Sequence, residues 1–452
     1  MKKIIVLFSI LFFAVTNVAN ASLKSDIDTV ISQSDINKGT ISVSVKNFRT
    51  GKTVYALHQN AQVSPASTQK IITATPAFME LGEDYKFSTK LYKDNKNNYV
   101  IVLGADPYLT SRELERLVKS MPKEPASVCI DSSVIDYNLW GEGWQWDDDL
   151  NPLMPKFSAY NLDKNLIEVM ITPTVKGYSP IVKTVVDYPM NFINKMKTDK
   201  VTDYTVKRQN NISPDTLILE GTISEKKSEF VKVPINNPKK YFEKSLSDAI
   251  INHDISCNGI YRNVKINKNY TMITLLSHDI DHAKTDVYKN SNNMVAETVF
   301  KLAGGKYAGR KSGKKVPVTG SFANGKLMFD DFCKQHKIDT SDIKITDASG
   351  VSKNNLVTAD FMTDFLLKTQ GCLESELPTA GEGTLSNRML YLRDNLRAKT
   401  GTLNNISAIT GYVNSKRGQK YVFCIMINDS KSTSANKKIL EEYIIRTIYS
   451  KG

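Results

Sequence analysis

A change of character at about residues 90 and 265 constrains the fold of this chain more than any other feature. On either side the sequence carries helical patterns with apolar faces, such as "SNNMVAETVFKLAGG". Between them, β-type runs alternate with Asn-, Pro- and Lys-rich turns. A chain of 452 residues normally forms two or three domains. The middle stretch is typical of one or two β-rich accessory domains.

The segment before this stretch predicts a hairpin followed by a helix. In "GTISVSVKNFRTGKTVYALHQN", Ile41, Val43 and Val45 alternate with polar residues ahead of a turn at "RTGK". The next segment, "SPASTQKIITATPAFMELG", starts with small polar residues and ends at Gly82, as a helix does. Pro76 lies within this expected helix.

The C-terminal part predicts a sheet and a final helix. The tail "LRAKTGTLNNISAITGYVNSKRGQKYVFCIMIND" is expected to form two long strands joined at "NSKRGQ". The last segment, "SANKKILEEYIIRTIYSKG", has apolar residues at helical spacing, and we expect all of them to pack in the core. These residues are Ile439, Leu440, Tyr443, Ile444 and Ile448.

Residues 1–21 are typical of a secretory signal peptide. Two lysines precede a mostly apolar run of about 12 residues, too short for the roughly 20 needed to span a bilayer. Small residues at "ANA" then suit cleavage near Ala21. We expect an exported, periplasmic protein; an uncleaved anchor is the alternative.

The cysteines and histidines do not predict a metal site or a cofactor. No Cys-x-x-Cys pair occurs, and His278 and His282 have no third ligand suggested nearby. Export permits a disulfide, but an odd number of cysteines leaves at least one thiol unpaired in a monomer, and Cys424 in "YVFCIMI" is expected in the core. The cysteines are Cys129, Cys257, Cys333, Cys372 and Cys424.

The net charge of +13 is spread along the chain rather than gathered in one block. A nucleic-acid interface would require a basic patch with stacking aromatic residues or a known motif, and neither stands out. For an exported protein the positive field favours anionic wall polymers or peripheral association with a membrane. A solvated lysine-rich surface without a partner explains the charge equally well.

Three short motifs occur in order along the chain, and context rather than spacing distinguishes them. Ser-x-x-Lys recurs five more times, as at Ser120–Lys123, and "GRKSGKK" has the wrong spacing for a phosphate-binding loop. The first motif, however, opens a helix, the second starts a helical segment, and the third begins a long apolar strand. Their residues are Ser67 and Lys70, then Ser291 and Asn293, then Lys399, Thr400 and Gly401.

These residue types suit nucleophilic catalysis. A serine hydroxyl is a poor nucleophile and requires an adjacent base. Three positions apart on a helix, Ser67 and Lys70 share one face. Lys70 can act as that base if burial or a neighbouring cation, for which Lys399 is a candidate, lowers its pKa. The helix start presents free N–H groups that suit a developing oxyanion, and the strand at Lys399 can pair with an extended peptide.

Together the motifs resemble those of the penicillin-recognising acyl-serine enzymes. The chain is most similar to the class C low-molecular-mass penicillin-binding proteins, the D-alanyl-D-alanine carboxypeptidase/endopeptidase family. The similarity runs over nearly the whole mature chain. It includes "ASTQK", "GADP", "GWQWDD", "NSNNMVAETVF", "DASGVSKNNL" and "AKTGTLN".

The resemblance implies a role for each catalytic residue. Ser67 would be the acylated nucleophile, and Lys70 would take its proton. Ser291 would relay a proton to the leaving D-alanine, supported by Lys399. Asn293 would bind the acyl side of the substrate.

The resemblance also implies a binding strand for the substrate. Thr400 and Thr402 would contact its carboxylate, with Gly401 between them. The backbone N–H groups of Ser67 and Thr402 would form the oxyanion hole. Ala348, where the family often has glycine, and Pro76 depart from the family pattern without removing a catalytic group, and Trp144 and Trp146 are expected to be structural.

By the same resemblance, we predict a mixed α/β fold of the penicillin-binding-protein/β-lactamase type, with an antiparallel sheet flanked by helices. The peptidase domain would comprise residues 22–90 and 265–452. The 224 positions from Ser67 to Ser291 leave room for an inserted accessory region at 91–264, made of two β-rich domains. Serine β-lactamases have no large domain there.

The predicted function is hydrolysis of D-alanyl bonds in peptidoglycan stem peptides through an acyl-enzyme on Ser67. The substrates would end in D-Ala-D-Ala or be cross-linked through D-Ala, and penicillins and other β-lactams would acylate the same serine. No metal, organic cofactor or nucleic acid is implied. A β-lactamase and a non-catalytic wall-binding protein of the same fold are the alternatives.

Overall fold

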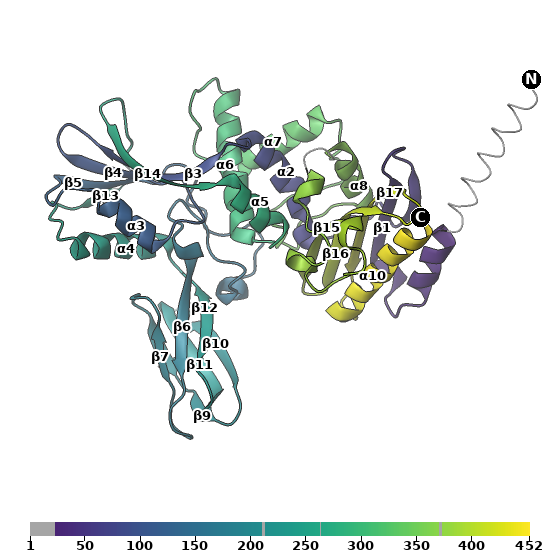
Figure 1. Cartoon of the computed structure of the whole chain (residues 1–452), viewed down its shortest axis with the longest axis horizontal. Helices are drawn as coiled ribbons and strands as arrows, with labels where there is room; N and C mark the ends of the chain where they lie inside the picture. Colours follow the sequence, from purple (N-terminus) through teal and green to yellow (C-terminus); the bar gives the residue numbers. More distant parts are fainter. Residues whose placement is uncertain (1–22, 210–212, 263, 370–372) are drawn as a thin grey trace, which may run out of the picture.

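The computed structural model describes residues 23–209, 213–262, 264–369 and 373–452 (Figure 1). The expected signal peptide and Cys372 lie outside the described residues. Residues 23–32 form the first helix. Among the described residues, no helix combines the length and the apolar character that crossing a membrane requires.

An antiparallel sheet forms the core of the part that carries the N- and C-terminal segments (Figure 1). Its strands, in spatial order, are β15 (Leu396–Leu403), β16 (Ile406–Asn414), β17 (Lys420–Asn428), β1 (Ile41–Asn47) and β2 (Thr53–Leu57). The predicted hairpin is therefore confirmed as β1 and β2. The expectation of two long strands in the tail is wrong: Asn405, with φ of 70°, turns the chain between β15 and β16. Asparagine tolerates this conformation better than most residues.

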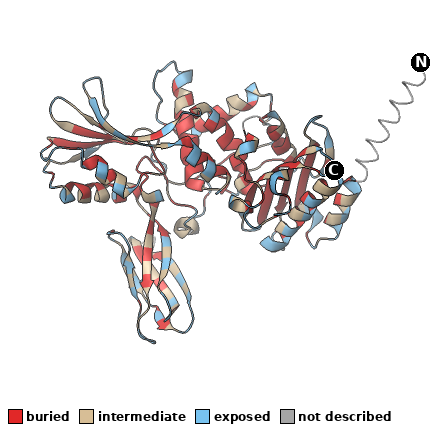
Figure 2. Ribbon diagram, in the orientation of Figure 1, coloured by how far each residue is buried: buried red, intermediate tan, exposed pale blue. Residues whose placement is uncertain are grey.

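Both faces of this sheet are covered, so its central strands are almost fully buried (Figure 2). Residues 23–32 and α10 (Ser434–Lys451) pack on one face. On the other face α8 (Ala359–Lys368) contacts β1, β16 and β17. Cys424 lies fully buried in this layer, as predicted.

Four more helices pack against one another. They are α2 (Lys70–Leu81), α5 (Ile280–Tyr288), α6 (Asn293–Lys311) and α7 (Phe322–Gln335). The predicted helix ends before Gly82, and Pro76 lies within α2. Helix α6 packs closely on α7, since a Cβ at Gly304 would lie 2.3 Å from the Gly325 nitrogen.

A second five-stranded sheet is built mainly from the middle of the chain. Its order is β13 (Ile260–Arg262), β5 (Ser127–Asp131), β4 (Asn98–Val102), β3 (Lys86–Lys93) and β14 (Thr271–Asp279). Helices α3 (Ser111–Val118) and α4 (Pro238–Asn252) pack against each other, and α3 also contacts β14. Strands β3 and β14 pair with each other, although β3 starts before residue 91 and β14 lies after residue 264. The division of the chain into domains stays a prediction.

Two smaller sheets form a separate elongated body (Figure 1). One contains β12 (Glu229–Pro234), β6 (Leu166–Thr172) and β7 (Ile181–Thr184). The other contains β10 (Asp203–Gln209), β11 (Ser213–Ser224) and β8 (Asn191–Asn194), with β9 (Lys197–Asp199) also paired to β11. Val169, Leu217 and Leu219 are among the buried residues between them.

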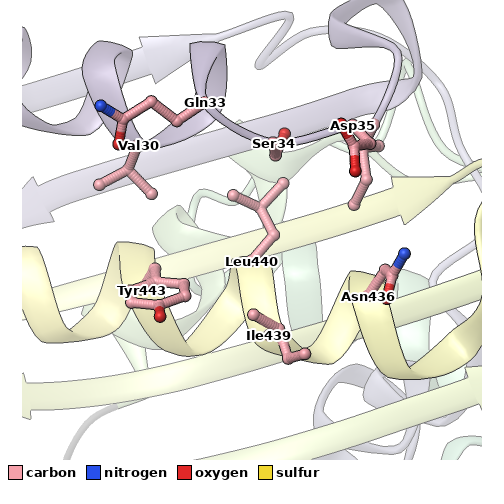
Figure 3. A pocket seen from close by; sticks show the side chains of 9 residues that line it. Val30, Gln33, Ser34, Asp35, Asn436, Ile439, Leu440 and Tyr443 are labelled. Carbon is pink, nitrogen blue, oxygen red and sulfur yellow. The ribbon is translucent and has the colours of Figure 1, made fainter.

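The predicted final helix is confirmed as α10, but not all of its apolar residues enter the core. Leu440, Ile444 and Ile448 are buried, whereas Ile439 and Tyr443 are about half exposed. The last two line a groove of about 450 Å³ between α10 and the end of the first helix (Figure 3). They face the neighbouring helix rather than the sheet, so helical spacing alone overestimated the core.

Candidate active site

Ser67 lies in a tight turn directly before a helix. The 3-10 turn η2 (Ala66–Gln69) leads into α2, so Ser67 precedes the α-helix itself by three residues. Ala66 has φ of 47°, a conformation that L-residues seldom adopt. Gly350 packs on this turn, since a Cβ there would lie 2.0 Å from the Ala66 oxygen. The neighbours of Ser67 are buried while Ser67 itself is partly exposed, which leaves its hydroxyl accessible.

Lys70 is fully buried and its amine contacts three oxygens. Its Nζ lies 2.9 Å from Ser67 Oγ, 2.7 Å from Asn293 Oδ1 and 2.7 Å from the Ser349 carbonyl oxygen. Burial lowers the pKa of Lys70 from 10.5 to about 7, against the opposing effect of the Asp347 and Glu297 carboxylates. A neutral amine has two N–H groups and one lone pair. With Asn293 and Ser349 accepting the two N–H groups, the lone pair is directed at the Ser67 hydroxyl.

Two buried carboxylates hold the loop that supplies the Ser349 carbonyl. Glu297 Oε1 accepts hydrogen bonds from the Ala348 and Ser349 nitrogens, at 3.0 and 2.8 Å. Asp347 accepts from the nitrogens of the three residues after Ser349, at 2.8 to 3.0 Å. Burial, followed by the charge of Asp347, raises the pKa of Glu297 from 4.5 to about 8. Ala348 is itself fully buried, so the departure from the family pattern lies in a packed position.

Ser291 approaches a second buried lysine. Lys399 Nζ donates to Ser291 Oγ at 2.8 Å and to the Thr400 carbonyl oxygen at 2.8 Å. Burial, and then repulsion by Lys70, lower the pKa of Lys399 well below its ordinary value. Ser291 has φ of 60°, and Asn292 caps α6 by accepting from the Val295 nitrogen. The helix start therefore directs Ser291 towards Lys399, and Asn293, the first residue of α6, towards Lys70.

Strand β15 brings the third motif against the turn of Ser67. A Cβ at Gly401 would lie 2.8 Å from the Ser67 nitrogen, so glycine allows the strand to approach. Thr400 is nearly buried, and its hydroxyl donates to Thr384 Oγ1 at 2.7 Å. Thr402 is exposed. Since β15 is the edge strand of its sheet, an extended peptide can pair with it beside Ser67.

A loop from the middle of the chain reaches the same place. Asn293 Nδ2 donates to the Leu153 carbonyl oxygen at 2.9 Å. Trp144 is buried and its indole N–H donates to Asp347 Oδ2 at 2.7 Å, a structural role in keeping with the prediction. Trp146 was predicted structural too, but its side chain lies outside the described part of the structure.

The described histidines and cysteines make other contacts. In the described parts of the chain, no cluster of three His, Cys, Asp or Glu residues could hold a metal ion. His278 instead pairs with Asp106, its Nδ1 lying 2.7 Å from Asp106 Oδ2. The four cysteines that the structure describes are all free thiols.

All eight predicted site residues thus meet at the junction of α2, α6 and β15. Four further residues of the site were not predicted from the sequence: Glu297, Asp347, Ser349 and Thr384. Glu297 carried a signal, since it lies four positions after Asn293 in the otherwise apolar start of α6. Asp347 begins the quoted segment "DASGVSKNNL", although its role there was not predicted. Thr384 had no motif to mark it.

Residues 23–446 match the family model described as the D-Ala-D-Ala carboxypeptidase 3 (S13) family. A D-alanyl-D-alanine carboxypeptidase of Actinomadura sp. is 23% identical over 94% of this chain and 84% of its own. The carboxypeptidase DacB of Haemophilus influenzae is 24% identical, over 85% of this chain and 84% of its own.

Solved structures share the same fold. Penicillin binding protein 4 of Haemophilus influenzae matches with a TM-score of 0.79 at 21% identity, over 95% of this chain and 99% of its own. The same protein complexed with a β-lactam matches with a TM-score of 0.76 at 20% identity, over 94% and 99% of the two chains. The predicted mixed α/β fold, with its additional β-sheets, is confirmed.

Proposed function

This chain belongs to the D-Ala-D-Ala carboxypeptidase 3 (S13) family of serine hydrolases, and from this premise we propose that it hydrolyses D-alanyl bonds of peptidoglycan stem peptides through an acyl-enzyme on Ser67. The reaction would release terminal D-alanine, cut cross-links made through D-alanine, or both. The contact of the buried Lys70 amine with the Ser67 hydroxyl, at 2.9 Å, carries this proposal.

Acylation would begin with proton transfer from Ser67 to Lys70. The Lys70 amine, neutral in part near pH 7, accepts the proton while Oγ attacks the carbonyl carbon of the D-alanyl bond. Asn293 and Ser349 hold the amine throughout, so little reorganisation accompanies the transfer. The backbone nitrogens of Ser67 and Thr402 would stabilise the oxyanion.

The leaving D-alanine would receive its proton from Ser291. Lys399 holds the Ser291 hydroxyl by a hydrogen bond of 2.8 Å, and the proton that Lys70 took from Ser67 would replace the one that Ser291 gives up. The carboxylate of the substrate would bind beside Thr400 and Thr402, where Thr384 already fixes the Thr400 hydroxyl. Water then hydrolyses the acyl-enzyme and frees Ser67.

We further propose that penicillins acylate Ser67 and that the protein acts in the periplasm. A β-lactam has been observed in the complex of the Haemophilus relative, and it presents a strained amide in place of the D-alanyl bond. Export is supported by the apolar run after Lys2 and Lys3. Cell fractionation tests the second proposal, and recovery of the protein only from the cytoplasm would contradict it; the N-terminal mass then shows whether the chain is cleaved near Ala21 or keeps an uncleaved anchor.

Labelling with a fluorescent penicillin tests the first proposal. The wild-type protein should form a long-lived adduct, and Ser67→Ala should form none. Ser120→Ala, which alters another Ser-x-x-Lys, is the matched control and should label normally. Labelling of Ser67→Ala would disprove the acyl-enzyme assignment.

Product analysis on purified peptidoglycan then tests the reaction. Release of D-alanine from pentapeptides identifies carboxypeptidase activity, and conversion of cross-linked dimers to monomers identifies endopeptidase activity. Rapid turnover of penicillin without a lasting adduct would instead support a β-lactamase. Binding of muropeptides with neither product would support a non-catalytic role.

A further inference from the structure

The elongated body of two small sheets ends in three loops that meet at one point. The connections are residues 173–180, between β6 and β7, residues 200–202, between β9 and β10, and residues 225–228, between β11 and β12. The pairing of Thr172 with Ile181 and of Asp203 with Thr222 places them at the same end. We call this end the distal tip; in Figure 1 it lies beside β9, away from the rest of the molecule.

Hydrogen bonds fix the loops of the distal tip to one another. The Gly177 nitrogen donates to the Thr198 oxygen at 2.9 Å, and the Thr198 nitrogen donates to the Tyr178 oxygen at 2.8 Å. The Glu225 nitrogen donates to the Asp199 oxygen at 3.0 Å. These bonds fix the backbone of the loops, and therefore also the positions from which their side chains project.

Three of those side chains are large, apolar and very exposed. Val175, Tyr178 and Val201 are 71, 70 and 66% exposed. Among the described residues only six large apolar side chains exceed 65%, so half of them gather at this tip. Single exposed apolar residues are ordinary, whereas a cluster indicates a surface that another phase or partner covers.

Five lysines lie on the loops of the distal tip or directly beside them. Four acidic residues lie near these lysines. Lys176 pairs with Asp199 at 3.6 Å and Lys227 pairs with Glu229 at 3.3 Å. The other two acids are Asp203 and Glu225. The tip therefore carries a small positive excess, and its lysine stems are long enough to reach past the shorter acids. The lysines are Lys176, Lys197, Lys200, Lys226 and Lys227.

We propose that the distal tip docks peripherally on an anionic lipid bilayer. Val175, Tyr178 and Val201 would enter the boundary between headgroups and acyl chains, and the lysines would contact anionic headgroups. Two valines offer neither a stacking face nor a hydrogen-bonding group to a glycan, which favours lipid over wall polymer. Strand β11 has 12 residues, about 40 Å at roughly 3.3 Å each, so docking would hold the active site well above the bilayer.

Vesicle co-sedimentation of the exported protein, which we expect to begin near Ser22, tests the proposal. The wild type should bind vesicles of phosphatidylcholine with about 30% phosphatidylglycerol, and bind pure phosphatidylcholine at least about tenfold more weakly. Replacing the three apolar tip residues by serine should lower the affinity about tenfold. The matched control replaces equally apolar but scattered residues and should bind as the wild type does. The control substitutions are Val316→Ser, Tyr261→Ser and Ile251→Ser.

Charge reversal separates the role of the lysines. Lys200→Glu, Lys226→Glu and Lys227→Glu together should abolish the preference for phosphatidylglycerol, whereas Lys314→Glu with Lys315→Glu should not. The urea unfolding transition should stay that of the wild type in every variant, which shows that the fold is intact without relying on the Ser67 proposal. Absence of vesicle binding by the wild type, equal loss in the control, or loss of binding to purified sacculi in place of vesicles would overturn the proposal.

Discussion

Lys70 and Lys399 are both fully buried at the candidate site, yet their surroundings differ. Lys70 lies on the side of α6 and the 347–355 loop, where two buried carboxylates act on it. Lys399 lies on the side of β15 and contacts only neutral oxygens, those of Ser291 and Thr400. The carboxylates Glu297 and Asp347 do not touch the Lys70 amine; they act through their charge and through the loop.

This difference separates two uses of a buried amine. With burial partly offset by carboxylates, the pKa of Lys70 settles at about 7, where it can accept and return a proton. Burial and repulsion by Lys70 lower the pKa of Lys399 well below its ordinary value, and no carboxylate among the described residues opposes this effect. We expect Lys70 to act as the base that limits the rate at low pH, and Lys399 to act as a hydrogen-bond donor to Ser291.

The largest expected effect follows from removing the base. Lys70→Met keeps much of the side-chain volume but removes the proton acceptor, and should slow penicillin acylation about 10³-fold. In the wild type, acylation should fall as the pH drops below about 7, because the ammonium form cannot accept the proton. Stopped-flow acylation between pH 5 and pH 9 measures both. Lys284→Met, which removes another buried lysine, is the control; an equal loss there would contradict the assignment.

A smaller effect is expected at the other lysine. Lys399→Met removes the donor to Ser291 and should lower acylation about 10²-fold. The acidic limb of the pH profile should stay near pH 7, because the base is still Lys70 and its pKa is governed by burial and by the carboxylates. A shift of the acidic limb by one pH unit or more would contradict this expectation and show that Lys399 influences the pKa of Lys70.

The sequence was sufficient to predict the eight motif residues of the candidate site, because each belongs to a short motif with a local structural context. Ser67 and Lys70 fall at a helix start, and Lys399 to Thr402 on a strand. The same local patterns predicted the β1–β2 hairpin and α10.

The residues that tune the site were harder to predict, because their role depends on contacts between distant segments. Glu297 matters through the nitrogens of Ala348 and Ser349, about 50 positions away. The break between β15 and β16 depends on the single turn at Asn405, inside a run that otherwise reads as one strand. The exposure of Tyr443 depends on the groove between α10 and the end of the first helix, which is formed by segments far apart in the sequence.

Thr384 tests the strand side on a finer scale. Thr384→Val removes the hydroxyl that accepts from Thr400 at 2.7 Å, and should raise the KM for a D-alanyl-D-alanine peptide about threefold to tenfold. The kcat should change less, because Thr384 contacts neither lysine. Thr384→Ser keeps the hydroxyl and should restore the KM. A fall in kcat with KM unchanged would place Thr384 in the chemical step instead.

The smallest expected effect concerns stability on the Lys70 side. Folding raises the pKa of Glu297 from 4.5 to about 8, so the unfolded chain ionises this carboxyl first. Below pH 4.5 the carboxyl is neutral in both states and costs nothing. Between pH 4.5 and pH 8 the ionisation of Glu297 lowers the free energy of unfolding progressively, and above pH 8 this loss is constant.

Glu297→Gln cannot ionise and can still accept from the Ala348 and Ser349 nitrogens. It should therefore be more stable than the wild type at pH 8.5 by on the order of 2 kcal/mol, with little difference at pH 4.5. Urea unfolding at the two pH values measures this, and the exposed Glu124→Gln should show no such change. A stability gain that is equal at both pH values would mean that the charge of Glu297 is not what the fold opposes, and the carboxylates would then matter to Lys70 through the loop alone.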